Sequence, residues 1–266
     1  MFTQWHVDGT DNIRLLRSRK KQDDMSNEFT YPDIAKMIDH ALLSPTLSTS
    51  DLDTGIKLAL AYDVASVCIM PCAVPRCAKM LSGSTVKTST VIGFPLGLNA
   101  TAVKRAEAEQ AIADGCEELD MVVNVSKVIS GDWTEVRDDI AAVIEVAHGK
   151  KQKVKVIFEN CYLNDDQKIR LCEISGELNA DWVKTSTGFG TSGATIDDIR
   201  LMRKHSPSHV QVKAAGGIRD LEMVEKMRDL EVSRVGASRT KEILDECRIQ
   251  LGLSKIDVAD SPIGGY

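Results

Sequence analysis

Short clusters of apolar residues, rich in valine and isoleucine, recur along the chain at intervals of roughly 30 residues. Polar or turn-forming residues bound each cluster, as is typical of short β-strands that are buried on both faces. The clusters span residues 37–39, 66–70, 89–94, 118–123, 154–158, 182–183, 210–214 and 232–236. The pattern therefore predicts eight short strands.

Amphipathic segments separate these clusters and predict helices over residues 50–62, 74–81, 100–114, 133–147, 165–178, 195–204, 221–228 and 240–247. Several of them open with residues that commonly cap a helix N-terminus: Ser48, Asn99, Asp132, Asn164 and Asp220. Eight strands that alternate with eight helices predict an α/β protein, a single-domain (β/α)8 TIM barrel. A doubly wound sheet is the alternative, but its Gly-x-Gly-x-x-Gly turn after the first strand is absent.

The composition limits the classes of partner. The 266 residues suffice for one large barrel, and a hydrophobic content of 43% with 27% charged residues is ordinary for a globular protein. A net charge of −6 gives no electrostatic reason to expect nucleic acid or an anionic membrane as partner. No apolar run is long enough to span a membrane, and the first residues do not resemble a secretory signal, so we expect a cytoplasmic protein.

The domain organisation follows from where the periodic pattern begins and ends. We expect a disordered polar tail over residues 1–30, the barrel as catalytic domain over 31–252, and a flexible tail over 253–266. The seven cysteines contain no Cys-x-x-Cys pair, so we expect reduced thiols and no metal site.

Five charged residues lie in the predicted strands, where a TIM barrel is usually apolar: Asp39, Asp120, Lys155, Lys184 and Lys213. Active sites of this fold lie at the carboxyl ends of the strands. Any one of these residues could form only a structural salt bridge, but five together favour chemistry.

Lys184 is the candidate nucleophile. It ends the sixth predicted strand, and a buried lysine is costly unless it is paired or loses its proton. Taken alone, it could equally reach from the strand end to water. Lys213 ends the next strand and could destabilise the Lys184 ammonium, which would leave a neutral amine able to form a Schiff base. Asp120 could then transfer protons, and Lys155 could hold Asp120 ionised.

Glycine-rich loops after the last strands predict a phosphate site. Gly216 and Gly217 follow the seventh strand, while Gly236 and Ser238 lie at the end of the eighth. In this fold these loops commonly bind phosphate through backbone N–H groups, and Gly188 after the sixth strand can join them. Turn formation alone is the alternative role for such glycines.

Two motifs carry a resemblance to a known family: Val-Lys-Thr-Ser-Thr-Gly-Phe at 183–189 and Lys-Ala-Ala-Gly-Gly-Ile-Arg at 213–219. With residues 38–43, 90–97 and 118–124 they resemble deoxyribose-phosphate aldolase, a class I aldolase, over about residues 31–250. The resemblance implies reversible cleavage of 2-deoxy-D-ribose 5-phosphate to D-glyceraldehyde 3-phosphate and acetaldehyde in deoxynucleoside catabolism, without metal or organic cofactor.

The resemblance also implies roles for single residues. Lys184 would form the Schiff base, Lys213 would assist it, and Asp120 would transfer protons. We group Lys155, Asp39, Cys68 and the five glycine-loop residues with substrate binding; a thiol of Cys68 that faces the pocket could be attacked by aldehyde.

The chain departs from the family pattern at two places. Arg239 replaces a second serine after the eighth strand, where it could add a cation to the phosphate site or point outward. Met70 stands where an aromatic residue is common in the family, so the resemblance does not fix this part of the pocket wall. The terminal Tyr266 is either part of a disordered tail or a proton carrier over the site.

Two other functions stay open on the sequence alone. One is another lysine Schiff-base aldolase of the same fold, such as a transaldolase or a keto-acid aldolase. The other is a non-catalytic barrel that binds sugar phosphates. Barrels of this size often form dimers, so a homodimer is among the expected states.

Overall fold

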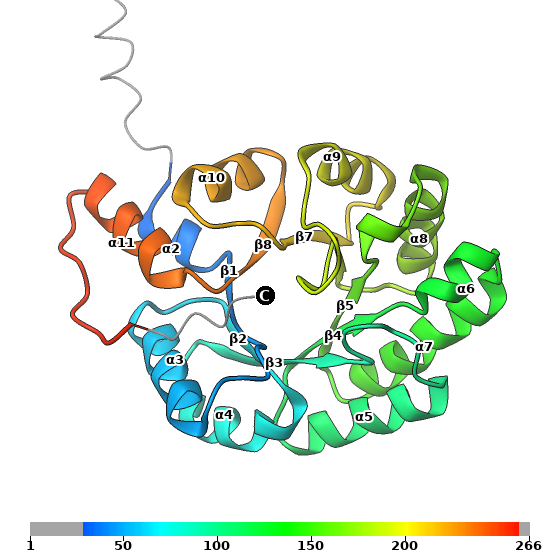
Figure 1. Cartoon of the computed structure of the whole chain (residues 1–266), viewed down its shortest axis with the longest axis horizontal. Helices are drawn as coiled ribbons and strands as arrows, with labels where there is room; N and C mark the ends of the chain where they lie inside the picture. The colour runs from blue at the N-terminus through cyan, green and yellow to red at the C-terminus, as the bar shows by residue number, and fades with distance from the viewer. Residues whose placement is uncertain (1–28, 261–266) are drawn as a thin grey trace, which may run out of the picture. The chain divides into compact units, whose positions relative to one another are not determined.

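The computed structural model describes residues 29–260, and in this range eight parallel strands form a closed barrel in sequence order (Figure 1). The strands are β1 (Ile38–Leu42), β2 (Ser66–Ile69), β3 (Lys87–Ile92), β4 (Glu118–Val122), β5 (Lys153–Ile157), β6 (Trp182–Lys184), β7 (Gln211–Ala215) and β8 (Val232–Ala237). β8 pairs with β1, which closes the barrel. The predicted (β/α)8 TIM barrel is therefore confirmed.

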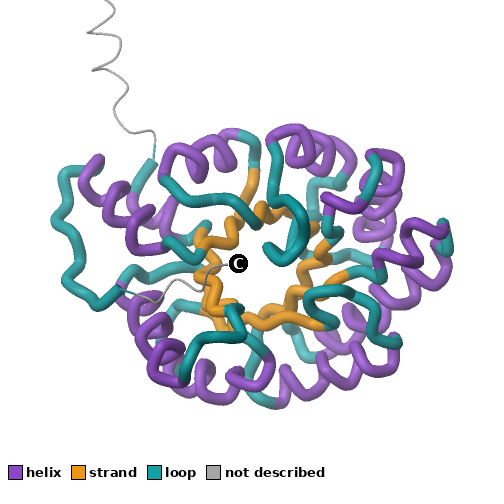
Figure 2. Tube along the Cα trace, viewed as in Figure 1, coloured by secondary structure: helices purple, strands orange, loops and turns teal. Residues whose placement is uncertain are grey.

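Helices surround the strands as an outer layer (Figure 2). They are α2 (Tyr31–Ala35), α3 (Thr49–Ala61), α4 (Val74–Leu81), α5 (Thr101–Ala113), α6 (Val125–Ser130), α7 (Trp133–Gly149), α8 (Asp165–Glu177), α9 (Ile196–His205), α10 (Leu221–Asp229) and α11 (Thr240–Gln250), with 3-10 turns η1 (Pro71–Ala73) and η2 (Asn160–Tyr162). Each of the eight predicted helices is present within a few residues of its expected ends. The short helices α2 and α6 were not predicted.

Three of the five predicted caps form the expected bond. The side chains of Ser48, Asn164 and Asp220 each accept a hydrogen bond from a backbone N–H of the first helical turn. Asn99 does not cap α5, whereas Asp132 is the N-cap residue of α7 as predicted but its side chain makes no capping bond. Helix α5 begins two residues after Asn99, and the Asp132 carboxylate pairs with Lys127 at 3.1 Å.

The apolar core lies between the strands and the outer helices. Helix α7 shows the principle, because Val136, Ile140, Val143 and Ala147 recur at helical spacing and are buried. A buried ion pair also joins two neighbouring helices here: the Nζ of Lys104 on α5 lies 2.5 Å from Asp139 on α7 and donates to the Val122 carbonyl at 2.9 Å.

Inside the barrel, by contrast, inward-facing residues from alternate strands form stacked layers of four that are largely polar. The strand register gives a floor of Ser66, Glu118, Trp182 and Arg234, a middle layer of Asp39, Ser89, Lys155 and Lys213, and an upper layer of Cys68, Asp120, Lys184 and Gly236. TIM barrels usually fill these layers with bulky branched residues. Here their charged members pair with one another, as described below.

The structure describes only part of the two predicted tails. Residues 1–28 and 261–266, which include Tyr266, lie outside the described residues. Residues 253–260 contain no helix or strand, but Lys241 on α11 donates to the Val258 carbonyl at 2.9 Å and pairs with Asp260 at 2.5 Å. Among residues 29–260, no helix has the length and apolar character that a membrane span requires.

Candidate active site

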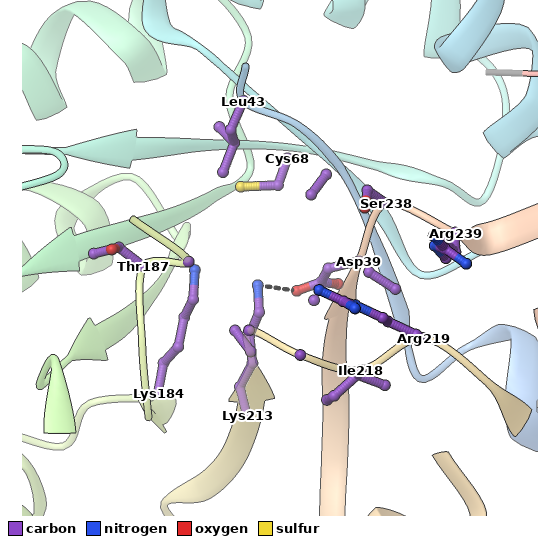
Figure 3. Close-up of a pocket in the computed structure, with 17 residues that line it drawn as sticks. Asp39, Leu43, Cys68, Lys184, Thr187, Lys213, Ile218, Arg219, Ser238 and Arg239 are labelled. Atoms are coloured by element: carbon purple, nitrogen blue, oxygen red, sulfur yellow. Dashed lines mark ion pairs between the residues drawn. The ribbon is translucent and has the colours of Figure 1, made fainter. Parts of the chain in front are cut away.

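A cavity of ≈ 230 Å³ opens at the carboxyl ends of the strands (Figure 3). Most of the predicted site residues line it: Asp39, Cys68, Lys184, Gly188, Lys213, Gly216, Gly217, Gly236 and Ser238. Asp120 and Lys155 do not line it, but Asp120 contacts Lys184 and Lys213, the two lysines at the mouth of the cavity, and Lys155 contacts Asp120. The strand ends thus bring the predicted residues together.

Lys184 is buried, with 2% of its surface exposed, and its Nζ lies 2.8 Å from Oδ2 of Asp120. Burial, and secondarily the neighbouring Lys213 ammonium, lowers the pKa of Lys184, although Asp120 opposes this shift. Both causes were expected from the sequence, and burial is the larger of the two. A neutral amine facing a cavity is a nucleophile toward carbonyl compounds.

Lys213 extends beside Lys184 into the same cavity (Figure 3). Its Nζ lies 2.7 Å from Oδ2 of Asp120 and 2.5 Å from Oδ2 of Asp39. Burial opposes the ammonium form, but Asp120 and Asp39 outweigh it and hold the pKa of Lys213 above its ordinary value. The pKa values of two lysines on adjacent strands are thus shifted in opposite directions, which favours the charged form of Lys213 and the neutral form of Lys184.

Asp120 is the acceptor that the mouth lysines share. Its carboxylate has no exposed surface, and Lys155 donates to Oδ1 at 2.8 Å. Burial favours the neutral acid, yet Lys155, Lys184 and Lys213 together hold the pKa of Asp120 well below its usual range. Lys155 is fully buried and contacts Asp120, so its geometry supports the predicted role of holding Asp120 ionised; its grouping with substrate binding stays a prediction.

Three loops place backbone groups at the rim of the cavity. Gly216 and Gly217 have φ values of +83° and +82°, a conformation that favours glycine. The loop after β6 lies directly against them, since Ala194 N–H donates to the Gly216 carbonyl at 3.1 Å. Ser238 and Arg239 line the cavity immediately before α11 begins, and a helix N-terminus favours anions. The arrangement can bind a phosphate.

Arg239 and Arg219 both line this cavity, and Figure 3 shows them on the same side as Ser238. For Arg239 this geometry favours the first of the two alternatives, a cation added to the anion site. Met70 packs with Phe94 against a small apolar cluster of Leu43, Cys68 and Val91, of which Leu43 and Cys68 line the cavity, so Met70 supports this part of the wall from behind. Burial raises the pKa of the Cys68 thiol, which keeps it protonated.

The loop of residues 185–187, which the sequence left without a role, is held by a buried acid. Glu159 accepts hydrogen bonds from the Thr187 hydroxyl and from the Thr187 N–H, at 3.2 Å for the latter. Glu159 has φ +57°, unusual for a residue other than glycine, and burial raises its pKa. The carboxylate thus fixes the chain between Lys184 and Gly188.

Sequence reasoning missed two further charged residues of the interior, Glu118 and Arg234. Arg234 bonds Glu118 through both of its terminal nitrogens, each at 2.9 Å, and Asp39 at 2.7 Å. The spacing could have identified them, because residues two apart in a strand point to the same side. Glu118 precedes Asp120 by two residues, and Arg234 precedes Gly236 by two, so both face the barrel interior. Among residues 29–260, no group of three or more His, Cys, Asp or Glu side chains is arranged to hold a metal ion.

Comparisons with known proteins agree on one family. A family model described as DeoC/LacD family aldolase matches residues 34–244. A deoxyribose-phosphate aldolase of Rhodopirellula baltica is 60% identical over 239 residues, covering 90% of this chain and 99% of that protein. One of Caldanaerobacter subterraneus is 44% identical, covering 85% and 98%. The structure of deoxyribose phosphate aldolase from Aeropyrum pernix, described as a unique tetramer, has a TM-score of 0.78 at 28% identity and covers 85% of this chain and 96% of that one.

Proposed function

The chain belongs to the DeoC/LacD family of aldolases, and on this premise we propose that it is a deoxyribose-phosphate aldolase. It would cleave 2-deoxy-D-ribose 5-phosphate reversibly to D-glyceraldehyde 3-phosphate and acetaldehyde, in the breakdown of deoxynucleosides. One observation carries the proposal: a buried Lys184 with a lowered pKa faces a cavity whose opposite rim is built from glycine loops, Ser238 and two arginines.

The reaction begins with the neutral amine of Lys184. It attacks the aldehyde carbon C1 of the open-chain sugar, and loss of water gives an iminium ion. The C2–C3 bond then breaks: the C3 hydroxyl loses its proton, its oxygen becomes the carbonyl of glyceraldehyde 3-phosphate, and the bonding electrons move toward the iminium nitrogen. The remaining two carbons form an enamine on Lys184. Protonation at C2 and addition of water release acetaldehyde and restore the amine.

Asp120 and Lys213 would move the protons in these steps. Asp120 has no exposed surface, whereas Lys213 lines the cavity and contacts Asp120 at 2.7 Å. We assign a relay in which the Lys213 ammonium takes up the C3 hydroxyl proton as it passes one of its own protons to Asp120, and the reverse transfer then protonates C2 of the enamine. Binding of the phosphate at the rim, by Gly188, Gly216, Gly217, Gly236 and Ser238, holds the reacting carbons over Lys184.

Reductive trapping tests the proposal. The protein is incubated with acetaldehyde, reduced with borohydride, digested and mapped by mass spectrometry. We expect an ethyl group on Lys184, its loss in Lys184→Met, and its persistence in Lys204→Met, which removes an exposed lysine of α9. A label confined to another lysine, or no label, would overturn the mechanism.

Substrate assays separate the alternatives. Release of acetaldehyde from 2-deoxyribose 5-phosphate supports the proposed activity, whereas cleavage of keto acids instead would indicate another lysine aldolase of this fold. A regulatory barrel would bind phosphate esters without forming an imine. The predicted homodimer and cytoplasmic location stay predictions; because the Aeropyrum pernix relative is described as a tetramer, light scattering should compare dimer with tetramer.

A further inference from the structure

Seven ionisable side chains form one continuous network through the barrel interior, which we call the barrel network. Its members are Asp39, Glu118, Asp120, Lys155, Lys184, Lys213 and Arg234. Three are carboxylates and four are cations. With every group ionised, the barrel network therefore carries one surplus positive charge in a largely dry interior, where such a charge is costly.

The ion pairs are distributed unevenly among the four cations. Arg234 contacts two carboxylates, Lys155 contacts Asp39, Glu118 and Asp120, and Lys213 contacts two. Lys184 contacts a single carboxylate oxygen, Oδ2 of Asp120, and shares it with Lys213. Lys184 is thus the least compensated cation, and the one whose deprotonation removes the surplus at least cost.

Arg234 is the cation that creates the surplus. Its guanidinium group cannot lose a proton in a protein. Burial opposes its charge, but Asp39 and Glu118 raise the pKa of Arg234 still further. Without Arg234, three carboxylates would face three lysines, and the barrel network would be neutral with Lys184 protonated.

Arg234 lies at the end of the barrel opposite the candidate active site. With Glu118 and Trp182 it lines a second cavity of ≈ 520 Å³ among the amino ends of the strands. The Trp182 ring covers the guanidinium carbon at 5.0 Å and the Lys155 nitrogen at 5.5 Å from its centroid. This placement excludes contact between Arg234 and a substrate in the mouth.

We propose that Arg234 is a positioning residue for the aldolase reaction: a permanent cation at the barrel floor that leaves the amine of Lys184 unprotonated, with the charge of its partner Glu118 acting in the opposite direction. The inference rests on the proposed function, since it concerns the same nucleophile. It adds that the reactivity of Lys184 is set by the charge balance of the whole barrel network, of which the neighbouring Lys213 is one part.

Six other charged or titratable groups lie near Lys184 or pair with its neighbours Lys213 and Asp120, and they must stay unchanged in any test. They come from β1, β2, β4, β5, β7 and the loop after β5, and they are Asp39, Cys68, Asp120, Lys155, Lys213 and Glu159. The test variants below change none of them. Shifts in the pH dependence can then be assigned to Arg234 and Glu118.

The experiment measures the pH dependence of imine formation with acetaldehyde, by reductive trapping between about pH 5 and 9, together with the pH profile of kcat/KM. Arg234→Met should raise the pKa of Lys184 and so shift the acidic limb of both profiles to higher pH by about 0.5 to 1 unit. Trapping at neutral pH should then slow about threefold to tenfold. Arg234→Lys restores a cation and should return the limb most of the way to its wild-type position.

Removing the charge of Glu118 as well tests the charge balance itself. The double variant Arg234→Met/Glu118→Gln again holds one more cation than carboxylates, so it should recover the wild-type limb although both floor partners are lost. Glu118→Gln alone raises the surplus to two positive charges and should shift the acidic limb to lower pH. A merely structural role for the pair predicts that the double variant is at least as impaired as either single one.

Lys168→Met serves as the matched control, because it removes a buried lysine paired with Asp165 and Asp198 on the outer helices. Its limb should not move. An unchanged limb in a folded Arg234→Met, or failure of the double variant to recover, overturns the inference. If Arg234→Met does not fold, the downward shift in Glu118→Gln decides in its place, and no shift there refutes the proposal. Absence of a label in the wild-type protein would instead refute the proposed function.

Discussion

Gly193 offers a test of how closely the phosphate site depends on the packing of two loops. It lies in the loop after β6, and its backbone touches the loop after β7. A Cβ atom added at Gly193 would lie 2.2 Å from the carbonyl oxygen of Gly216 and 2.4 Å from the carbonyl carbon. Both contacts are with backbone, so no side chain can rotate away. The Gly193→Ala variant must therefore separate the two loops.

The displacement can be estimated from these distances. Nonbonded heavy atoms prefer separations of about 3.5 to 4.0 Å, so Gly216 must move by about 1 Å or more. Errors of about 1 Å in positioning a reacting group cost about 100-fold in rate. We expect kcat/KM for 2-deoxyribose 5-phosphate to fall about 100-fold, equivalent to about 2.7 kcal/mol.

The assay compares 2-deoxyribose 5-phosphate with 2-deoxyribose, which lacks the group that these loops would hold. The loss should be confined to the phosphorylated substrate, and reductive trapping of acetaldehyde on Lys184 should be unaffected. Gly149→Ala is the control, since a Cβ at Gly149 meets nothing within 4 Å. Equal losses on both substrates, or no loss on either, would refute the role assigned to the loops.

Three further predictions concern charge and burial. Asp120→Asn removes the carboxylate that three lysines share, so kcat should fall at least about 100-fold while the circular dichroism spectrum stays that of the wild type. Burial lowers the pKa of His40 to about 4, below its value of about 6.5 in an unfolded chain, so the unfolded state binds the additional proton. The free energy of unfolding should consequently fall by up to about 3 kcal/mol between pH 6.5 and 4, and urea titrations should show a smaller fall in His40→Gln. Lys104→Met leaves the Asp139 carboxylate buried without its lysine and should cost about 3–5 kcal/mol in thermal or urea unfolding; Lys104→Met/Asp139→Leu should recover most of this loss.

The barrel was predictable because its strands are nearly continuous apolar clusters at a regular interval, and this pattern depends on local sequence alone. Lys184 and Lys213 could be found for a related reason: a charged residue within a short apolar cluster is conspicuous. Lys184 ends β6 as expected, whereas Lys213 lies in the middle of β7 and not at its end. The register then places them side by side. Local sequence patterns were therefore sufficient to predict both the barrel fold and the candidate nucleophile Lys184.

The contact between Glu118 and Arg234 could not be predicted from the sequence, for a physical reason. They are 116 residues apart, and each taken alone resembles an exposed residue in the first half of a strand. Only closure of the barrel and the stagger of its strands bring β8 beside β1 and aim both side chains at the centre. The contact between Glu159 and Thr187 joins two loops in the same way, and loop conformations of this kind leave little trace in hydrophobic periodicity.

The polar layers inside the barrel also bear on the response of the protein to temperature. Unfolding exposes surface whose hydration changes the heat capacity, upward by about 0.45 cal/mol/K for each Å² of apolar surface and downward by about 0.26 for polar surface. Each 100 Å² of barrel interior that is polar instead of apolar thus lowers the heat capacity change by about 0.07 kcal/mol/K. Because a smaller heat capacity change flattens the dependence of stability on temperature, this interior should broaden the range over which the barrel stays folded, toward cold as well as heat.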